Sequence, residues 1–386
     1  MSVNPTTRRL RAAALLTGTS LAASAFAAGP VAADTMAPIE HLGSFFVTEN
    51  LTEGEDWATA TSAEIIDVTD DGTTAVYTDG VAGRVGFVDI SDPTNPQPLG
   101  AIEVGDPTSA AVAGEYLLVS NNTSEDFVNT SGELLVFDLA SRGLLTTLAL
   151  SGQPDAVAVA PSGAYAAIAI ENERDEDLED ADGNAGLIPQ APAGTLDIVD
   201  LAGDPSEWAV RSADLTGLAE TAPDDPEPEF VDINEADQAV VTMQENNHIA
   251  VVDLASGDVV SHFSAGTVDL DGIDLTEEEL GPQGNGLIEF TESRAGIRRE
   301  PDAVKWIDDD SFATANEGDY EDADGEEGGS RGFTIFNVDG TVEYDAGTEF
   351  EFRVASAGHY PEGRSANKGS EPEGLAVGTI GEIPYL

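Results

Sequence analysis

The chain has 386 residues, of which 41% are hydrophobic, so it can bury a large core within one domain. Its 74 acidic residues outnumber its 15 basic ones, giving a formal net charge of −59 at pH 7 that repels nucleic acid and anionic membranes. The absence of cysteine excludes disulfides and thiolate metal sites. The acidity has two interpretations: adaptation to a salty habitat, where screening relieves self-repulsion, or a surface loaded with calcium.

The N-terminus, residues 1–33, has the pattern of a signal peptide. Thr7-Arg8-Arg9-Leu10-Arg11 precedes an apolar region over Ala12–Ala28, and Val31-Ala32-Ala33 offers small residues for cleavage. The twin arginines favour the Tat route, and the alternatives are ordinary secretion and an uncleaved membrane anchor. We expect a secreted or cell-surface mature chain, residues 34–386, with no transmembrane segment.

A short unit ending in Val-Asp-Leu or a close variant recurs along the mature chain. Its five copies are Val88-Asp89-Ile90, Phe137-Asp138-Leu139, Val199-Asp200-Leu201, Val252-Asp253-Leu254 and Phe336-Asn337-Val338. Successive copies lie 49, 62, 53 and 84 residues apart, close to a four-stranded blade plus variable loops. The repeat predicts an all-β fold, a β-propeller over residues 34–386. The acidic stretches 171–184, 267–280 and 319–328 are expected to be solvated loops between blade strands.

A second element, a proline followed in most copies by an acid, precedes the first strand of a repeat. Its copies are Pro107-Thr108, Pro154-Asp155, Pro228-Glu229, Pro301-Asp302 and Pro372-Glu373. In a closed propeller, Asp155, Glu229, Asp302 and Glu373 would point at equivalent places around the axis, and such a ring of oxygen ligands suits a hard cation such as Ca²⁺. The alternative for any single copy is a capping role in a turn.

The basic residues gather near the C-terminus. Arg298 and Arg299 come just before Pro301, and Arg364 and Lys368 come just before Pro372. If both pairs lie on one face of the propeller, they would suit a phosphate or carboxylate ligand. The alternative is that they pair with the abundant neighbouring carboxylates.

Neither a nucleophile elbow in its proper context nor a histidine metal motif is found in the sequence. Gly328-Gly329-Ser330-Arg331-Gly332 has the letters of a nucleophile elbow, but an acidic loop precedes it and a predicted strand follows it, so Ser330 is interpreted as a loop residue. The four histidines show no close metal-binding spacing, so the sequence predicts no zinc site.

Thr314-Ala315-Asn316-Glu317-Gly318-Asp319, together with Lys368-Gly369-Ser370-Glu371-Pro372-Glu373-Gly374, resembles the choice-of-anchor I family of bacterial surface proteins. That family is related to mesenchyme-specific cell-surface glycoproteins and is often labelled alkaline-phosphatase-like. The resemblance implies a seven-bladed propeller, exported and held at the surface by one of several C-terminal anchors. Two departures stand out: Ser370 replaces an expected proline, and the chain stops a few residues into a strand expected to begin at Glu373. We therefore expect a C-terminally truncated, incomplete propeller.

Two functions fit these residue types. The first is a binding or surface-matrix module that holds Ca²⁺ on its axis and takes a phosphate-bearing or anionic ligand or a cell-surface component, but no nucleic acid. The second is a metal-dependent phosphoric ester hydrolase, in which Glu317, Asp319 and Glu373 hold the metal and a clamp grips the phosphate. The clamp residues would be Arg298, Arg299, Arg364 or Lys368. A structural adhesin that binds no small ligand is a third possibility. The complete predicted metal set is Asp155, Glu229, Asp302, Glu317, Asp319 and Glu373.

Overall fold

The computed structural model describes most of residues 40–386. The description leaves out residues 52–53, 55–57, 59, 176–177, 179–185, 187, 277–286, 319–327 and 381–382. The predicted signal peptide, residues 1–33, lies outside the described residues, as does Asp319 of the predicted metal set. The chain divides into a unit Met1–Leu42 and a unit Gly43–Leu386, and the second contains every helix and strand of the described residues.

Five antiparallel sheets of four strands follow one another along the described chain, and within each the strands pair in chain order. We number these sheets blades 1 to 5. Blade 1 contains β1 (Ala63–Val68), β2 (Thr74–Asp79), β3 (Arg84–Asp89) and β4 (Gln97–Glu103). Blade 2 contains β5 (Pro107–Ala113), β6 (Tyr116–Asn122), β7 (Gly132–Asp138) and β8 (Gly143–Ala149). Blade 3 contains β9 (Pro154–Val159), β10 (Tyr165–Ile170), β11 (Thr195–Asp200) and β12 (Val210–Asp214). Blade 4 contains β13 (Pro228–Ile233), β14 (Gln238–Met243), β15 (His248–Asp253) and β16 (Asp258–Ser264). Blade 5 contains β19 (Val304–Trp306), β20 (Ser311–Ala315), β21 (Phe333–Asn337) and β22 (Val342–Asp345).

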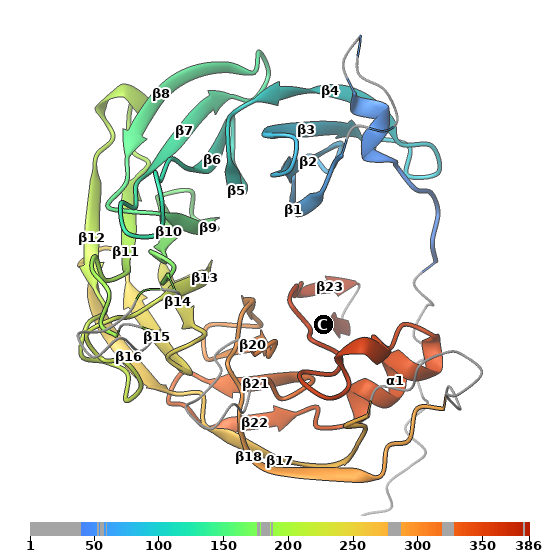
Figure 1. The fold of residues 1–386 in the computed structure, drawn as a ribbon. Coiled ribbons are helices and arrows are strands. Elements are labelled where there is room, and N and C mark those ends of the chain that lie inside the picture. Colours follow the sequence, from blue (N-terminus) through green and yellow to red (C-terminus); the bar gives the residue numbers. More distant parts are fainter. Residues whose placement is uncertain are drawn as a thin grey trace, which may run out of the picture. The chain divides into compact units, whose positions relative to one another are not determined.

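The first strands of successive blades are neighbours. Strand β1 contacts β5, β5 contacts β9, β9 contacts β13, and β13 contacts β19. Figure 1 shows β1, β5, β9 and β13 on the inner side of their sheets, around a common centre. This arrangement is a β-propeller, which confirms the fold predicted from the repeat. The structure describes five four-stranded blades, and the number seven stays a prediction.

The core lies between the faces of neighbouring blades. One cluster joins Val85 and Phe87 of blade 1 to Leu117 and Leu135 of blade 2, and similar clusters fill the next three interfaces. In blades 1 to 4, the second and third strands are buried along nearly their whole length because both of their faces meet apolar side chains. This double burial explains the continuous apolar runs in the sequence.

The aspartate of the Val-Asp-Leu unit ends the third strand of a blade and stabilises the turn that follows. Asp89 Oδ1 accepts a hydrogen bond from the Ser91 N–H at 2.9 Å, and Asp138 Oδ1 accepts one from the Ser141 N–H at 2.7 Å. Asp253 makes the same bond to the Ser256 N–H at 2.8 Å. The repeated aspartate is thus a local turn signal, which is why it marks the blades so regularly.

Two predictions of secondary structure were wrong, one of a loop and one of a strand. Residues Thr267–Ile273 form strand β17, which pairs with β18 (Glu292–Arg298), so the stretch 267–280 is not a loop throughout. Its acids alternate with half-buried or buried apolar residues, and the acidic composition masked that alternation. Near the C-terminus, residues 373–377 form no strand, and the final hairpin is β23 (Gly378–Ile380) with β24 (Ile383–Tyr385). Ser330 precedes strand β21, as expected for a loop serine.

The described residues contain four short helical segments. These are η1 (Val47–Asn50), η2 (Pro205–Glu207), α1 (Glu349–Ala357) and η3 (Glu362–Arg364). A buried arginine, Arg331, connects α1 and the segment after it to other parts of the chain. Arg331 is 1% exposed, and its guanidinium donates to the carbonyl oxygens of Asp274, Ser365 and Asn367 at 2.9, 2.7 and 3.0 Å. It also contacts the Glu351 carboxylate of α1 at 3.3 Å. One side chain therefore connects its own loop to three other segments, around Asp274, Glu351 and Ser365.

Candidate metal centre

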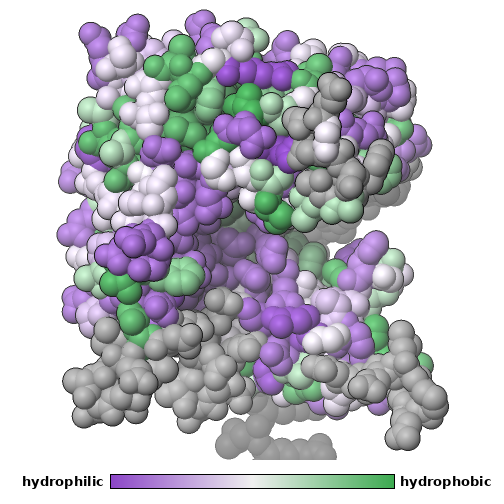
Figure 2. All heavy atoms as spheres, turned by 45° about the horizontal axis from the view of Figure 1, so that its top comes forward, coloured by the Kyte–Doolittle hydropathy of each residue, from purple (hydrophilic) through white to green (hydrophobic). Residues whose placement is uncertain are grey.

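The inner strands surround a cavity of about 1940 Å³. Figure 2 shows this hollow from a tilted view, with hydrophilic side chains in purple along its walls. Two basic side chains, Arg174 and Lys305, lie among its described lining residues, and no histidine does. Its carboxylates are Glu64, Asp67, Asp70, Asp155, Glu171, Glu173, Asp175, Glu227, Glu229, Asp232, Glu245, Asp302, Glu317 and Glu373. The cavity is therefore strongly acidic.

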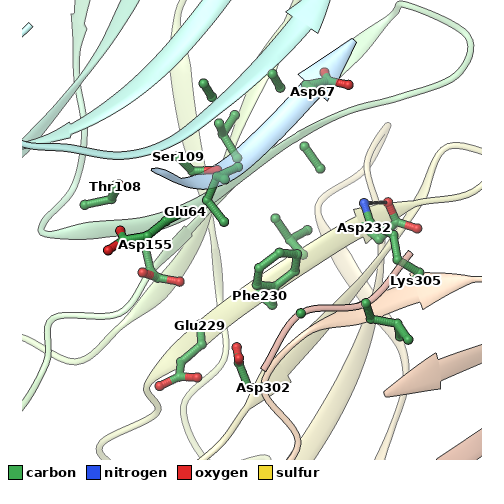
Figure 3. Close-up of a pocket in the computed structure, with 18 of the residues that line it drawn as sticks. Glu64, Asp67, Thr108, Ser109, Asp155, Glu229, Phe230, Asp232, Asp302 and Lys305 are labelled. Atoms are coloured by element: carbon green, nitrogen blue, oxygen red, sulfur yellow. Dashed lines mark hydrogen bonds and ion pairs between the residues drawn. The ribbon is translucent and has the colours of Figure 1, made fainter. Parts of the chain in front are cut away.

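The acids predicted to ring the axis all line this one cavity. Asp155 and Glu229 are the second residues of β9 and β13, Asp302 lies just before β19, and Glu373 follows the last Pro-acid proline. Figure 3 shows Asp155, Glu229 and Asp302 at neighbouring inner strands around one space. Glu317, predicted from the family motif, lines the same cavity. The shared position in each repeat is thus a shared position in space.

Blades 1 and 2 contribute residues to the cavity lining from the equivalent position of their first strands. Glu64 is the second residue of β1, and Thr108 is the second residue of β5. Both line the cavity, next to Asp155 in Figure 3. Glu64 was not predicted because no proline precedes it, although its place in the first strand is equivalent.

Three carboxylates of this cavity lie close enough together to share a metal ion. Each of Glu171, Glu229 and Glu245 offers one oxygen atom, and these oxygens lie within 4.8 Å of one another. Glu229 comes from β13, Glu171 directly follows β10, and Glu245 lies two residues after β14. We call these three residues the glutamate triad. Only Glu229 was among the predicted ligands; the signal for the other two was an acid just after the second strand of blades 3 and 4.

The environment of these acids favours their protonated forms when no cation is bound. Burial raises the pKa of Glu229 well above its usual range, and the negative charge of Glu245 raises it further. Burial and the charge of Asp155 do the same for the pKa of Glu171. The pKa of Asp302 is also raised well above its usual range, by burial and then by Asp155. Removing the protons therefore costs free energy unless a positive charge replaces them.

The pKa values of Asp155 and Glu227 are raised in the same way. Burial, then Glu173 and Glu64, raise the pKa of Asp155 to about 7. Burial, then Glu245, raise the pKa of Glu227 to about 9, although Arg174 opposes this shift. Arg174 forms ion pairs with Glu227 and, at 3.6 Å, with Asp225. One side of the cavity thus carries its own positive charge.

The four predicted clamp residues do not appear in the cavity lining. Arg298 pairs with Glu300 at 2.7 Å, and Arg299 pairs with Asp345 at 2.9 Å. Arg364 and Lys368 both approach Glu371, at 2.6 and 4.0 Å. These contacts are the carboxylate pairing that was the alternative interpretation. The phosphate clamp stays a prediction, and the basic residues that do line the cavity are Arg174 and Lys305.

The donor set fits a hard cation. Among the described lining residues the charged donors are carboxylate oxygens, which Ca²⁺ and Mg²⁺ prefer, whereas zinc sites generally include histidine or cysteine. Ca²⁺ accepts six to eight oxygens in flexible geometry, while Mg²⁺ demands a near-ideal octahedron. The wide, many-sided arrangement of acids therefore suits Ca²⁺ better. The triad would supply three ligand atoms, and Glu227 and Asp155 lie in the same cavity wall.

Comparison with known proteins identifies the family. The model of the choice-of-anchor I domain matches residues 64–328 and 326–386. The chain belongs to the choice-of-anchor I family. This choice-of-anchor I chain matches no curated protein. Among its described residues, no helix has the length and hydropathy needed to span a membrane.

Solved structures resemble the choice-of-anchor I chain only distantly. A chain of a nidogen/laminin complex is 15% identical with a TM-score of 0.34, over 53% of this chain and 64% of that one. A chain of a mitotic checkpoint complex is 10% identical with a TM-score of 0.46, over 75% and 66%. The β-propeller domain of Myceliophteria thermophila Cps50 (Swd1) is 10% identical with a TM-score of 0.39, over 74% and 87%. This chain covers less than two thirds of the first two chains.

Proposed function

We propose that this choice-of-anchor I propeller is an exported surface module that binds Ca²⁺ in its axial cavity. The observation that carries the proposal is the glutamate triad, whose three half-buried side chains offer oxygens within 4.8 Å of one another. Two ionised carboxylates at that separation repel each other by roughly 3 kcal/mol at an effective dielectric constant of about 20. A divalent cation turns this repulsion into attraction, so the cluster is suited to a cation.

The proposal also covers location and partner. The predicted signal peptide over residues 1–33 and the membership of the choice-of-anchor I family support export to the cell surface. A cation bound among carboxylates keeps coordination positions for a further oxygen ligand. An anionic or phosphate-bearing group of a cell-surface component would take such a position.

A calcium titration tests the binding function. The mature chain is melted at a fixed high salt concentration, so that general screening of its negative charge is already complete. Ca²⁺ in the micromolar to millimolar range is expected to raise the melting temperature in a saturable way, and Mg²⁺ is expected to raise it less. Binding at 100 times Kd would add about 2.7 kcal/mol to the free energy of unfolding. A melting temperature that does not respond to Ca²⁺ would reject the proposal.

The phosphoric ester hydrolase is the competing function, and the structure supports it less. Both basic side chains of the cavity are already paired, Lys305 with Asp232 at 2.9 Å and Arg174 with Asp225 and Glu227. The two functions separate in assays with p-nitrophenyl phosphate and phytate, with and without Ca²⁺. Calcium-dependent turnover would establish the hydrolase, whereas saturable Ca²⁺ binding without turnover would establish the binding module.

A further inference from the structure

In blades 3 and 4, an asparagine side chain accepts a hydrogen bond from the backbone N–H just before the first strand of the blade. Asn172 Oδ1 accepts a hydrogen bond from the Gln153 N–H at 2.8 Å, and Asn246 Oδ1 accepts one from the Glu227 N–H at 2.9 Å. Gln153 and Glu227 are the residues immediately before Pro154 and Pro228. Proline has no N–H, so each bond uses the last backbone donor ahead of the acid of the Pro-acid element.

The same two asparagines directly follow two members of the glutamate triad. Asn172 follows Glu171, and Asn246 follows Glu245. Each asparagine therefore joins the two segments that supply the acids of its blade. In blade 3 these acids are Asp155 and Glu171; in blade 4 they are Glu229 and Glu245.

Each asparagine is itself held in a fixed orientation. Asn172 is 4% exposed, and its Nδ2 donates to the Ala193 carbonyl oxygen at 3.2 Å. Asn246 is 2% exposed, and its Nδ2 donates to the Asp225 carbonyl oxygen at 3.0 Å. With both ends of the amide bonded and buried, the side chain cannot rotate without breaking several hydrogen bonds.

We propose that Asn172 and Asn246 are positioning residues for the cation site. They set the spacing between the acid of the inner strand and the acid after the second strand. The inference rests on the proposed function, because the spacing matters only if the carboxylates share a cation. Loss of a hydrogen bond to a ligand itself commonly weakens metal binding by about 10- to 100-fold, and because these asparagines act on the backbone beside the acids, we expect an effect near the lower end of that range.

Blade 2 supplies a matched control. Asn121 Oδ1 accepts a hydrogen bond from the Asp106 N–H at 2.8 Å, directly ahead of Pro107. Asn121 is 4% exposed, like its counterparts. The residues in the places of the two acids are, however, Thr108 and Ser120. Asn121→Ala therefore removes the same kind of bond without disturbing a carboxylate of the triad.

The test measures Ca²⁺ affinity by calorimetry in the mature chain, well below the melting temperature. The variants are Asn172→Ala, Asn246→Ala and Asn121→Ala. All three are expected to lower the melting temperature without Ca²⁺, and Asn172→Ala is expected to lower it most, because Asn172 has a φ of 55°, a backbone conformation that alanine disfavours. Asn172→Ala and Asn246→Ala are expected to weaken Ca²⁺ binding by about tenfold or more, and Asn121→Ala to leave it within about twofold of the starting protein.

Equal Ca²⁺ affinity in all three variants and the unchanged protein would overturn the positioning role. If an alanine variant does not fold, the serine variant at that position replaces it. The serine hydroxyl can still accept a hydrogen bond, although its side chain is shorter than that of asparagine. Serine is expected to weaken Ca²⁺ binding by an intermediate factor, and an unchanged affinity would again overturn the inference. If the unchanged protein binds no Ca²⁺, the proposed function fails instead, so the two failures are distinguishable.

Discussion

Blades 2 and 4 share the asparagine hydrogen bond ahead of the first strand but differ in the side chains beside it. In blade 2 the hydroxyl groups of Thr108 and Ser120 lie 2.9 Å apart and bond to each other. In blade 4 the equivalent places hold Glu229 and Glu245, two members of the glutamate triad. Blade 2 shows that this scaffold does not need carboxylates in order to fold. Holding Glu229 and Glu245 together costs free energy without a cation, because burial and the charge of Glu245 raise the pKa of Glu229, and the proposed cation binding would offset that cost.

The largest effect is expected when the triad is made as neutral as the pair in blade 2. Replacing Glu171, Glu229 and Glu245 together by glutamine keeps their size and removes three charges. Without Ca²⁺ at pH 8, the variant is expected to melt higher than the unchanged protein, because folding no longer has to protonate these buried acids or hold their negative charges together. Its melting temperature should no longer respond to Ca²⁺. Glu343→Gln, at an exposed site on β22, is the control and should keep the full response.

The reverse change gives the next largest effect. Thr108→Asp together with Ser120→Glu places a carboxylate pair in blade 2 at the same positions as in blades 3 and 4. Without Ca²⁺ the free energy of unfolding is expected to fall by roughly 1–3 kcal/mol, since Ser120 is fully buried. The rise in stability on adding Ca²⁺ should exceed that of the unchanged protein. Urea unfolding with and without Ca²⁺ measures both, and a rise no larger than normal would show that blade 2 lies too far from the cation.

A pH series tests the protonation of the acidic blades with a smaller effect. The folded-state pKa of Asp155 is about 7, against 3.8 as the ordinary value, and that of Glu227 is about 9 against 4.5. The folded state therefore holds more protons than the unfolded state between these values, and its stability is greatest below pH 4 for these groups. Stability without Ca²⁺ should fall as the pH rises through 7 and then 9.

Saturating Ca²⁺ should reduce that fall, because the cation replaces the protons. Asp155→Asn should flatten the part of the curve up to pH 7, while Ser120→Ala in blade 2 should leave its slope unchanged. Thermal melting from pH 5 to pH 9 provides the measurement. A melting temperature that rises across this range without Ca²⁺ would contradict the raised pKa values.

The smallest effect is expected outside the blades compared above. Arg364 is partly exposed and pairs with Glu371 at 2.6 Å. Such exposed ion pairs contribute about 0–1 kcal/mol to stability, so Arg364→Ala should barely change the melting temperature or its response to Ca²⁺. Binding of inorganic phosphate in the presence of Ca²⁺, measured by calorimetry, should also be unchanged. A loss of phosphate binding would instead support the clamp predicted from the sequence.

The parts of the fold that local chemistry determines could be predicted from the sequence. The aspartates at 89, 138 and 253 end strands because they bond to the backbone of the next turn, and that signal lies within a few residues. The Pro-acid element recurs at the same place in the repeat, and this repetition was enough to predict that its acids lie at equivalent places around the axis, where they line one cavity. Strand β17 was missed because its acids hide the alternation of its apolar residues.

The details of the site depended on contacts that no local pattern contains. Glu171 and Glu245 join Glu229 only once blades 3 and 4 lie side by side. The ion pairs of Arg298 and Arg299 likewise depend on tertiary neighbours, so clustering in the sequence said little about which carboxylate each would meet. The position of an acid within a repeat was informative, whereas the proximity of cations along the chain was not.

The buried arginine at position 331 has a consequence for how the C-terminal part of the chain opens. Its guanidinium bonds to three segments, around Asp274, Glu351 and Ser365. Releasing any one of them removes a partner from a buried charged group, which costs free energy, so none of them is expected to open alone. Helix α1 and the loop after it should behave as one cooperative unit, whose backbone amides exchange with deuterium at a common rate.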